Sequence, residues 1–396
     1  MTAKDLQKAL RQNIRDYGMY IALIIIMAIF TIATKGIFIS SRNIANLLNQ
    51  TGYIAVLAVG MTLVIVIRHI DLSVGFLSGF LGAIAAVALV NWHLSVWITL
   101  PLVLVLGILA GLLTALPVAK LGIPSFVASL AGWLIYRGAL LMVTSSTGTI
   151  VIPDPVFTAI GNGYIPDIMP ATSTFLPGLH KLTLLLGLVA IVWFILSEIG
   201  ARKSKQAYNF DVPPLDMFIL KLVFIAVALG LISWVLAGYN GMSWTVLIML
   251  AVVLVYDFVA KQTVLGRHIY AVGGNPDAAE LSGISVKKIT FIVFGSMGFL
   301  TALSGILFAS RLQSATPTGG TLFELDCIAA AYIGGVSAAG GVGKITGSLI
   351  GALVYMSLMN GMNLLGTDIS LQYVIRGAVL AIAVIFDVAT RKVKRG

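Results

Sequence analysis

Residues 338–344, which read AAGGVGK, come closest of any stretch in the sequence to a chemical motif. Glycines followed by a lysine at this spacing are typical of a loop whose backbone N–H groups bind the phosphates of a nucleotide. Here Ala338 stands where the motif has its first glycine, and Ile345 follows Lys344 where a Ser or Thr is needed for Mg²⁺. We therefore expect no ATP site in this chain.

The other reactive side chains do not form a catalytic or metal-binding pattern. Residues 281–284 (LSGI) echo the start of an ATPase signature but lack its second glycine. No nucleophile has a base at a usable spacing, and the four histidines are too scattered for a metal cluster. Cys327 is the only cysteine, which excludes an internal disulfide and any multi-cysteine metal site. We expect no enzyme activity, no cofactor and no metal.

The composition is that of a membrane protein. Hydrophobic residues make up 59% of the chain and charged residues only 10%, whereas soluble domains have about 25% charged residues. The net charge of +10 would suit a nucleic-acid-binding protein, but most basic residues lie in loops and at the chain ends, as in a protein with one basic membrane face. We therefore expect contact with membrane lipid and none with nucleic acid.

Twelve apolar runs predict an all-α fold, a polytopic transmembrane helix bundle of about 12 spans with a range of about 10–12. We assign residues 1–396 to one transmembrane domain. The run at 327–335 is short, but we expect it to extend in both directions as a Gly-rich span. The runs cover residues 19–38, 51–67, 72–91, 96–118, 125–144, 181–199, 216–237, 243–260, 289–309, 327–335, 345–365 and 371–388.

The distribution of Lys and Arg predicts the orientation. Basic residues concentrate at both chain ends and in the loops at 200–215 and 261–288, whereas residues 145–180 contain five prolines and no Lys or Arg. Because cytoplasmic loops carry the excess of basic residues, we expect both termini in the cytoplasm and residues 145–180 outside. The protein is expected to be multi-pass in the plasma or inner membrane. Residues 2–18 have the pattern of an amphipathic helix on the inner surface, or of a mobile basic tail.

The basic stretch 200–215 divides the chain into halves of about 1–200 and 216–396, and each half contains a break between two apolar runs. The first break, residues 68–75, reads RHIDLSVG, and the second, residues 334–343, reads GGVSAAGGVG. Irregular backbone at membrane depth is tolerated only where it faces protein or a water-filled path, and paired interruptions point to a binding site in transporters. We predict broken helices whose breaks line a translocation path, with these candidate residues: Asp71, Ser73, Gly75, Gly334, Gly335, Gly340 and Gly341.

The alternative is that both breaks are plain cytoplasmic turns and that their glycines serve helix packing. Glycines recur at small-xxx-small spacing along the chain, as at Gly107 and Gly111, and this spacing favours close helix contact. If Asp71 lies within the membrane it needs a partner, for which Arg68 and His69 are the candidates.

A long polar stretch, residues 266–288, separates two strongly apolar segments and has basic residues at both flanks. It contains the signals of a short helix, with Asn275 as the cap, Pro276 at the first position and Gly283 at the end. A short helix on a basic membrane face suits docking of a soluble partner, and the alternative is an ordinary solvated loop. The predicted docking residues are Gly273, Gly274, Asn275, Pro276, Asp277, Ala278, Ala279, Glu280, Leu281, Ser282 and Gly283.

Seven segments of the sequence carry a resemblance when they are taken together. They are residues 60–65 (GMTLVI), 70–75 (IDLSVG), 123–126 (IPSF), 271–275 (AVGGN), 281–284 (LSGI), 324–330 (ELDCIAA) and 334–343. The chain resembles the permease subunits of bacterial ABC importers for monosaccharides, the ribose/xylose/galactose group, and residues 145–237 resemble the xylose and multiple-monosaccharide branch. It departs from the family pattern at residues 113–116 (LTAL), where many relatives have Asn-Gly, and at Arg68-His69, where small or uncharged residues are common. These two departures leave the sugar open.

The resemblance implies the membrane-spanning permease subunit of an ATP-binding-cassette importer that moves a monosaccharide, D-xylose or a related sugar, into the cytoplasm. It implies a separate ATP-binding subunit docked on residues 273–283 at the cytoplasmic face, and an extracytoplasmic sugar-binding protein. A second permease copy, as a homodimer or with a close relative, would enclose the path. The alternative is an ion-coupled secondary transporter with Asp71 or Asp257 at a proton or sodium site.

Overall fold

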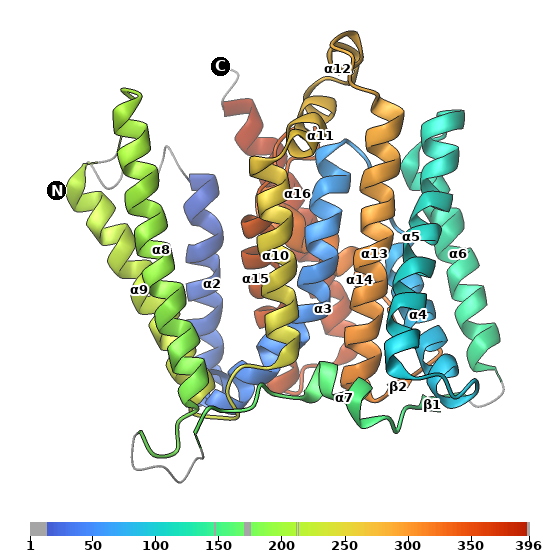
Figure 1. Cartoon of the computed structure of the whole chain (residues 1–396), viewed down its shortest axis with the longest axis horizontal. Helices are drawn as coiled ribbons and strands as arrows, with labels where there is room; N and C mark the ends of the chain where they lie inside the picture. The colour runs from blue at the N-terminus through green and yellow to red at the C-terminus, as the bar shows by residue number, and fades with distance from the viewer. Residues whose placement is uncertain (1–13, 146–147, 170–175, 211, 213, 394–396) are drawn as a thin grey trace. The chain divides into compact units, whose positions relative to one another are not determined.

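The computed structural model describes residues 14–145, 148–169, 176–210, 212 and 214–393. The expected amphipathic helix at residues 2–18 falls largely outside this part of the chain. In the part that the structure describes, nine helices are long and apolar enough to cross a membrane, and two shorter apolar helices accompany them (Figure 1). The predicted polytopic bundle of transmembrane helices is therefore confirmed. The nine helices are α3 (Ser41–Val66), α5 (Val96–Leu121), α6 (Ser125–Thr144), α8 (Lys181–Ala207), α9 (Leu215–Ala237), α10 (Trp244–Gln262), α13 (Val286–Leu312), α15 (Ile345–Leu364) and α16 (Ile369–Val393).

The remaining elements do not meet the criteria of length and hydropathy for a membrane span, and most of them are short. The two shorter apolar helices belong to α2 (Ile14–Ala33) and α4 (Val74–Val90). Four further helices and a 3-10 turn lie at the ends of the long helices or between them: η1 (Ile37–Ile39), α7 (Pro155–Asn162), α11 (Val264–Gly274), α12 (Pro276–Leu281) and α14 (Phe323–Ile333). The strands β1 (Ile150–Val151) and β2 (Ser314–Ala315) pair antiparallel, with Ile150 opposite Ala315.

The short apolar run at 327–335 forms α14, which extends only toward the N-terminus of the chain. The expected extension in the C-terminal direction is wrong, because the helix ends at Ile333 and Gly335 has a φ of 86°, a conformation that glycine adopts without steric cost. At 11 residues, α14 is about 17 Å long, roughly half of the hydrocarbon core of a bilayer. The second half of the chain therefore contains a broken helix, as the sequence predicts.

The chain folds into two compact units, and unit 1 contains the features that the sequence singles out. Unit 1 comprises residues 1–38, 47–163 and 245–396, and unit 2 comprises residues 39–46 and 164–244. Unit 1 takes segments from both sequence halves. The assignment of residues 1–396 to a single transmembrane domain stays a prediction.

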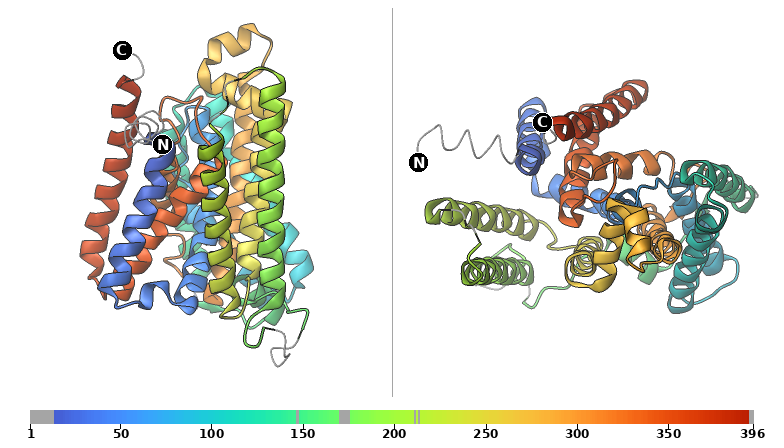
Figure 2. Two further views of the ribbon diagram at one scale, coloured as in Figure 1. Left: turned by 90° about the vertical axis from the view of Figure 1, so that its left-hand side faces the viewer. Right: turned by 90° about the horizontal axis from the view of Figure 1, so that it is seen from above.

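Glycines bring the central helices of unit 1 into backbone contact. A Cβ on Gly107 or Gly111 of α5 would clash with the backbone carbonyls of Gly298 or Phe294 in α13. Small residues at this spacing let two helices approach closely enough for van der Waals packing to hold them in lipid. The packing role that the sequence offered for these two glycines is confirmed. Figure 2 shows the helices from the side and, on the right, from above, where most of them are seen end-on.

The two ends of unit 1 carry different elements (Figure 1). One end has α11 and α12, the start of α2 and the end of α16. The opposite end has α7 and the β1–β2 pair. The described chain therefore begins and ends at the α12 end of unit 1. At the opposite end, the side chain of Asp154 caps α7 by accepting hydrogen bonds from the backbone N–H groups of Val156 and Phe157, both over 2.9 Å.

Unit 2 is built on the antiparallel helices α8 and α9. The carboxylate of Glu198 on α8 pairs with the ammonium of Lys221 on α9 over 2.7 Å. The start of α8 is fixed by the loop before it, because the carboxylate of Asp167 accepts hydrogen bonds from the N–H groups of Lys181 and Leu182 over 2.9 and 2.8 Å. These N–H groups have no partner within the helix, so Asp167 satisfies donors that would otherwise be orphaned.

Candidate functional site

The two sequence breaks meet at the α12 end of unit 1. The backbone N–H of Gly341, in the second break, donates to the carbonyl oxygen of Val66 over 2.8 Å. Val66 is the last residue of α3, so its carbonyl has no partner further along the helix. One break therefore caps the helix that leads into the other.

Arg68 joins the first break to the predicted docking segment. Its Nε donates to the carbonyl oxygen of Gly273 over 2.7 Å, and its second guanidinium nitrogen donates to the carbonyl oxygen of Gly274. Gly273 and Gly274 are the last residues of α11, where a cation satisfies orphan carbonyls and complements the helix dipole. Arg68 has a φ of 66°, a strained conformation for a residue with a side chain, which persists only where the surroundings fix it.

The second break is attached to α11 as well. The hydroxyl of Tyr270 donates to the carbonyl oxygen of Gly343 over 2.7 Å. Burial and, secondarily, the Asp257 carboxylate raise the pKa of Tyr270 to about 12, so the hydroxyl stays protonated and can donate. A Cβ on Gly273 would clash with the carbonyl oxygen of Val66 and lie 2.8 Å from the backbone nitrogen of Gly341. Only glycine fits at this contact.

We call this group of contacts the junction. It comprises Val66 and Arg68 from the first break, Tyr270, Gly273 and Gly274 from α11, and Gly340, Gly341 and Gly343 from the second break. Gly340 belongs to it because its φ is 80° and because a Cβ there would clash with the Cγ of Arg68. The structure thus brings together three segments that are more than 60 residues apart in sequence. Direct hydrogen bonds hold these segments in contact.

The docking segment forms the short helix that its sequence predicts. Asn275 accepts a hydrogen bond from the N–H of Ala278 over 3.1 Å, Pro276 occupies the first turn, and Gly283 follows the end of the helix with a φ of 82°. These three helix signals are confirmed. Leu281 is 92% exposed, so its whole side chain is available for contact with a partner.

The faces of α12 differ in exposure. Ala279 is buried at 4%, so it holds the helix on unit 1. Asp277, Glu280 and Leu281 are exposed. Gly274 is exposed too, and a Cβ there would meet no atom within 4 Å. A partner approaching this end of unit 1 would therefore meet the exposed face of α12 and, within the junction, the exposed Gly274.

Asp71 and Ser73 lie away from the junction, at the start of α4. The carboxylate of Asp71 is buried and accepts hydrogen bonds from the backbone N–H and the hydroxyl of Ser73, over 2.9 and 2.6 Å. The expected partners, Arg68 and His69, are wrong: Arg68 binds α11 instead, and Asp71 forms a local turn that competes well with longer-range pairing.

The other predicted path residues divide between packing and the junction. A Cβ on Gly75 would clash with the Glu324 carboxylate, and a Cβ on Gly334 would clash with the carbonyl oxygen of Gly347. Gly335 gives the turn after α14 its positive φ. Gly340 and Gly341 are in the junction.

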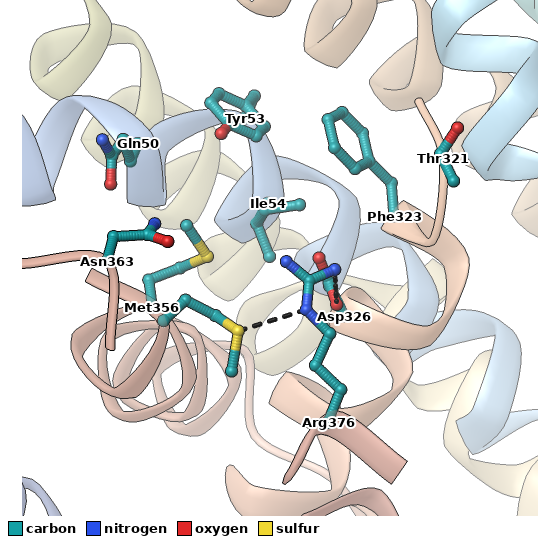
Figure 3. A pocket seen from close by; sticks show the side chains of 10 residues that line it. Gln50, Tyr53, Ile54, Thr321, Phe323, Asp326, Met356, Asn363 and Arg376 are labelled. Carbon is teal, nitrogen blue, oxygen red and sulfur yellow. Dashed lines mark hydrogen bonds and ion pairs between the residues drawn. The ribbon is translucent and has the colours of Figure 1, made fainter. Parts of the chain in front are cut away.

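One polar feature of unit 1 is absent from the sequence prediction. A cavity of about 200 Å³ lies between α3, α14, α15 and α16 (Figure 3). Its lining includes Asp326, whose carboxylate lies 3.5 Å from the guanidinium of Arg376 and accepts a hydrogen bond from the hydroxyl of Tyr355 over 2.5 Å. The only sequence signal is the presence of ionisable residues in apolar helices, which marks candidate functional positions in membrane proteins. The cavity is lined by Gln50, Tyr53, Ile54, Thr321, Phe323, Asp326, Met356, Met359, Asn363 and Arg376.

Asp257, the second carboxylate proposed for an ion site, forms an ion pair with a neighbouring lysine. Asp257 pairs with Lys261 one turn further along α10, over 2.8 Å. Such a pair is a common feature of helix surfaces. The geometry at Asp257 therefore gives no support to ion coupling there.

Comparison with known proteins assigns the chain to one class. The profile of a protein family described as branched-chain amino acid transport system / permease component matches residues 43–384. The chain is 40% identical, over 96% of its length and 98% of the relative, to the xylose transport system permease protein XylH of Haemophilus influenzae. It is 39% identical to XylH of Escherichia coli K12, over 96% of the chain and 93% of the relative. It is 34% identical, over 93% of the chain and 91% of the relative, to the ribose import permease protein RbsC of Haemophilus influenzae. No solved structure matches the chain.

Proposed function

The chain belongs to the family of branched-chain amino acid transport system / permease components, and from this premise we propose that it moves D-xylose or a related monosaccharide into the cytoplasm. It is a multi-pass inner-membrane protein, the permease subunit of a sugar ABC importer, and ATP is hydrolysed by a separate subunit. A substrate-binding protein is its other partner. The choice of xylose is supported by the higher identity to two xylose permeases than to the ribose permease.

The ATP-binding subunit docks on residues 273–283 at the cytoplasmic face. The observation that supports this docking is the junction, because it connects the exposed α12 to both breaks through hydrogen bonds at Arg68, Tyr270 and Gly341. When the ATPase closes, a displacement of α11–α12 must either move the two breaks or break these hydrogen bonds. A rigid connection of this kind converts closure into a switch between two states of the helix bundle.

The α12 end of unit 1 faces the cytoplasm in this proposal, and the α7 end faces the sugar-binding protein. The basic flanks of α12 support the orientation. Both described chain ends lie at the α12 end, so both termini are cytoplasmic. By resemblance to the family, two copies of the chain form a homodimer. The candidate path residues of the two breaks then act as an inner gate under control of the junction.

Transport by the purified importer tests the proposal. The permease is reconstituted in lipid vesicles with its ATP-binding subunit, its binding protein is added outside, and uptake of radiolabelled D-xylose and D-ribose is measured. We expect xylose uptake that requires ATP inside and persists when ion gradients are collapsed by ionophores. Uptake that needs a proton or sodium gradient and no ATPase would support the ion-coupled alternative. ATP-driven uptake of ribose alone would retain the importer and reassign its sugar.

A further inference from the structure

The polar cavity of unit 1 has the size of a small-ligand site. Its volume of about 200 Å³ is far above the roughly 10–15 Å³ that one water molecule needs. It is somewhat below the range of about 300–1,000 Å³ found for drug-sized ligands, which are larger than a monosaccharide. The cavity lies near the start of α14 and the end of α15, at the end of unit 1 opposite α12 (Figure 1).

The ion pair in the cavity leaves hydrogen-bonding capacity unused. Asp326 is 4% exposed, and burial of a carboxylate and a guanidinium is often no more stabilising than apolar packing. Among the described residues, Arg376 has one strong acceptor, Asp326, and its Nε donates to the thioether of Met359 over 3.2 Å, which is a weak acceptor. A guanidinium has five N–H donors. Arg376 can therefore bind further oxygen atoms in the cavity.

Polar and aromatic groups occupy different sides of the cavity (Figure 3). Gln50 and Asn363 lie at one side, and Asp326 with Arg376 at the other. The amide oxygen of Asn363 accepts a hydrogen bond from Gln372 over 3.0 Å, and its amide NH₂ group is a further donor. The rings of Tyr53 and Phe323 stack with centroids 5.2 Å apart and form an apolar wall.

This lining fits a neutral molecule with many hydroxyl groups. The opposite charges of Asp326 and Arg376 cancel, so neither a cation nor an anion gains a net attraction. A hydroxyl group both donates and accepts hydrogen bonds. The several hydroxyls of one such molecule can therefore pair with the carboxylate, the guanidinium and the amides of this lining. The C–H face of a sugar ring suits the aromatic wall.

We infer that this cavity is an intramembrane monosaccharide site, in which the permease itself binds the sugar after the binding protein releases it. The inference rests on the proposed sugar transport and adds a specific site within the permease. The sugar ring lies against Tyr53 and Phe323, and its hydroxyls bind Gln50, Asn363 and the Asp326–Arg376 pair.

Binding of D-xylose to the permease alone tests the site separately from transport. Purified permease in lipid nanodiscs, without ATPase or binding protein, is titrated with radiolabelled D-xylose. We expect saturable binding, weakened about 2- to 12-fold in Gln50→Ala and in Asn363→Ala through loss of single hydrogen bonds. Tyr53→Phe should keep the affinity and Tyr53→Ala should reduce it, because only the second variant removes the ring.

A matched pair of acid-to-amide variants provides the control. Asp326→Asn should abolish saturable binding, and Glu198→Gln should leave it unchanged, because Glu198 pairs with Lys221 in unit 2. Should Asp326→Asn fail to fold, Gln50→Ala and Asn363→Ala still decide the outcome. Equal affinity in all the cavity variants, or no binding by a permease whose complete importer transports xylose, would overturn the site. Failure of the complete wild-type importer to transport any sugar would instead overturn the proposed function.

Discussion

Arg68 and Gly273, 205 residues apart in sequence, are joined by a hydrogen bond of 2.7 Å from the guanidinium Nε to the backbone carbonyl oxygen. This bond connects the break that follows α3 to the end of α11, which leads into the exposed α12. A hydrogen bond from a charged donor contributes about 1.5–3 kcal/mol. A second bond from the same guanidinium to Gly274 makes Arg68 the strongest side-chain connection within the junction.

Replacement of Arg68 should therefore uncouple ATP hydrolysis from transport. Arg68→Met keeps the aliphatic stem beside Gly340 and removes every donor. We expect sugar uptake to fall about tenfold or more, as loss of about 1.5–3 kcal/mol implies, while the ATPase still co-purifies and hydrolyses ATP. The control is Lys288→Ala, an exposed basic residue on the flank of α12. Normal uptake in Arg68→Met would show that the junction does not transmit the motion.

Adjacent glycines at the end of α11 provide a paired test of the same contact. Gly273→Ala places a methyl group against the carbonyl oxygen of Val66, whereas Gly274→Ala places one in open space. Overpacking of this kind costs about 1–3 kcal/mol, so only Gly273→Ala should lower the melting temperature or the uptake rate. Thermal unfolding of the two purified variants gives the comparison. Equal behaviour would mean that the close approach at Gly273 is unimportant.

The start of α8 should show a pH dependence set by Asp167. Partial burial alone would raise the pKa of Asp167, but hydrogen bonds from the backbone N–H groups of Leu182, Lys181 and Ile168 outweigh it and hold the pKa below its ordinary value. A carboxyl group whose pKa is lower in the folded state stabilises the fold above its unfolded pKa of about 3.9, and this contribution is lost as pH falls through the folded pKa.

Asp167→Asn should accordingly lower the melting temperature at neutral pH, through a capping loss of about 0.5–2 kcal/mol. The difference from wild type should begin to shrink below about pH 4 and should disappear only once the pH has fallen below the folded pKa of Asp167. Glu198→Gln, in the same unit, is the control for loss of one carboxylate. A melting difference that is constant with pH would contradict the capping role of Asp167.

The orientation of unit 1 in the membrane can be tested with cysteines introduced at its two ends. After Cys327 is replaced by Ala, single cysteines are introduced as Val156→Cys in α7 and Ser282→Cys after α12, both at exposed positions. A membrane-impermeant thiol reagent added to intact cells should modify the first and spare the second, because the basic flanks predict a cytoplasmic α12. The reverse pattern would place α12 outside and remove the docking proposal.

Local signals in the sequence were sufficient to predict the short helix α12, and they failed where partners are distant. Asn275, Pro276 and Gly283 act on groups within a few residues, so their cap, first-turn and end positions could be read directly. The contact between Arg68 and Gly273 could not be predicted, because a single sequence carries no information on which distant segments meet. The same limit hid the pairing of Asp326 with Arg376.

Asp71 shows a different kind of error. Its polar partner is Ser73, two residues away, and an aspartate that binds its own chain two residues on is a common turn. The preference for Arg68 or His69 rested on charge, whereas the local hydrogen bonds fix the side chain. Arg68 was then free to bind carbonyl oxygens at the end of α11, a role that its charge alone does not suggest.

The exposed surface of α12 gives the sharpest test of ATPase docking. Leu281 is 92% exposed, and a charge placed in an apolar contact with a partner would be buried without a counter-charge when the partner binds. Leu281→Asp should therefore abolish co-purification of the ATPase, and Glu280→Lys should weaken it by placing like charges together if the partner surface is basic. Neither residue contributes to the junction or to a span, so membrane insertion and the melting temperature should be unchanged. The matched control pair replaces two exposed leucines by alanine, Leu281 in the docking segment and Leu231 in the span α9. Only Leu281→Ala should reduce ATPase binding. An aspartate at Leu231 would place a charge in lipid and is therefore unsuitable as a control. Normal ATPase binding and sugar uptake in Leu281→Asp and Glu280→Lys would reject α12 as the docking surface, whatever the junction variants show.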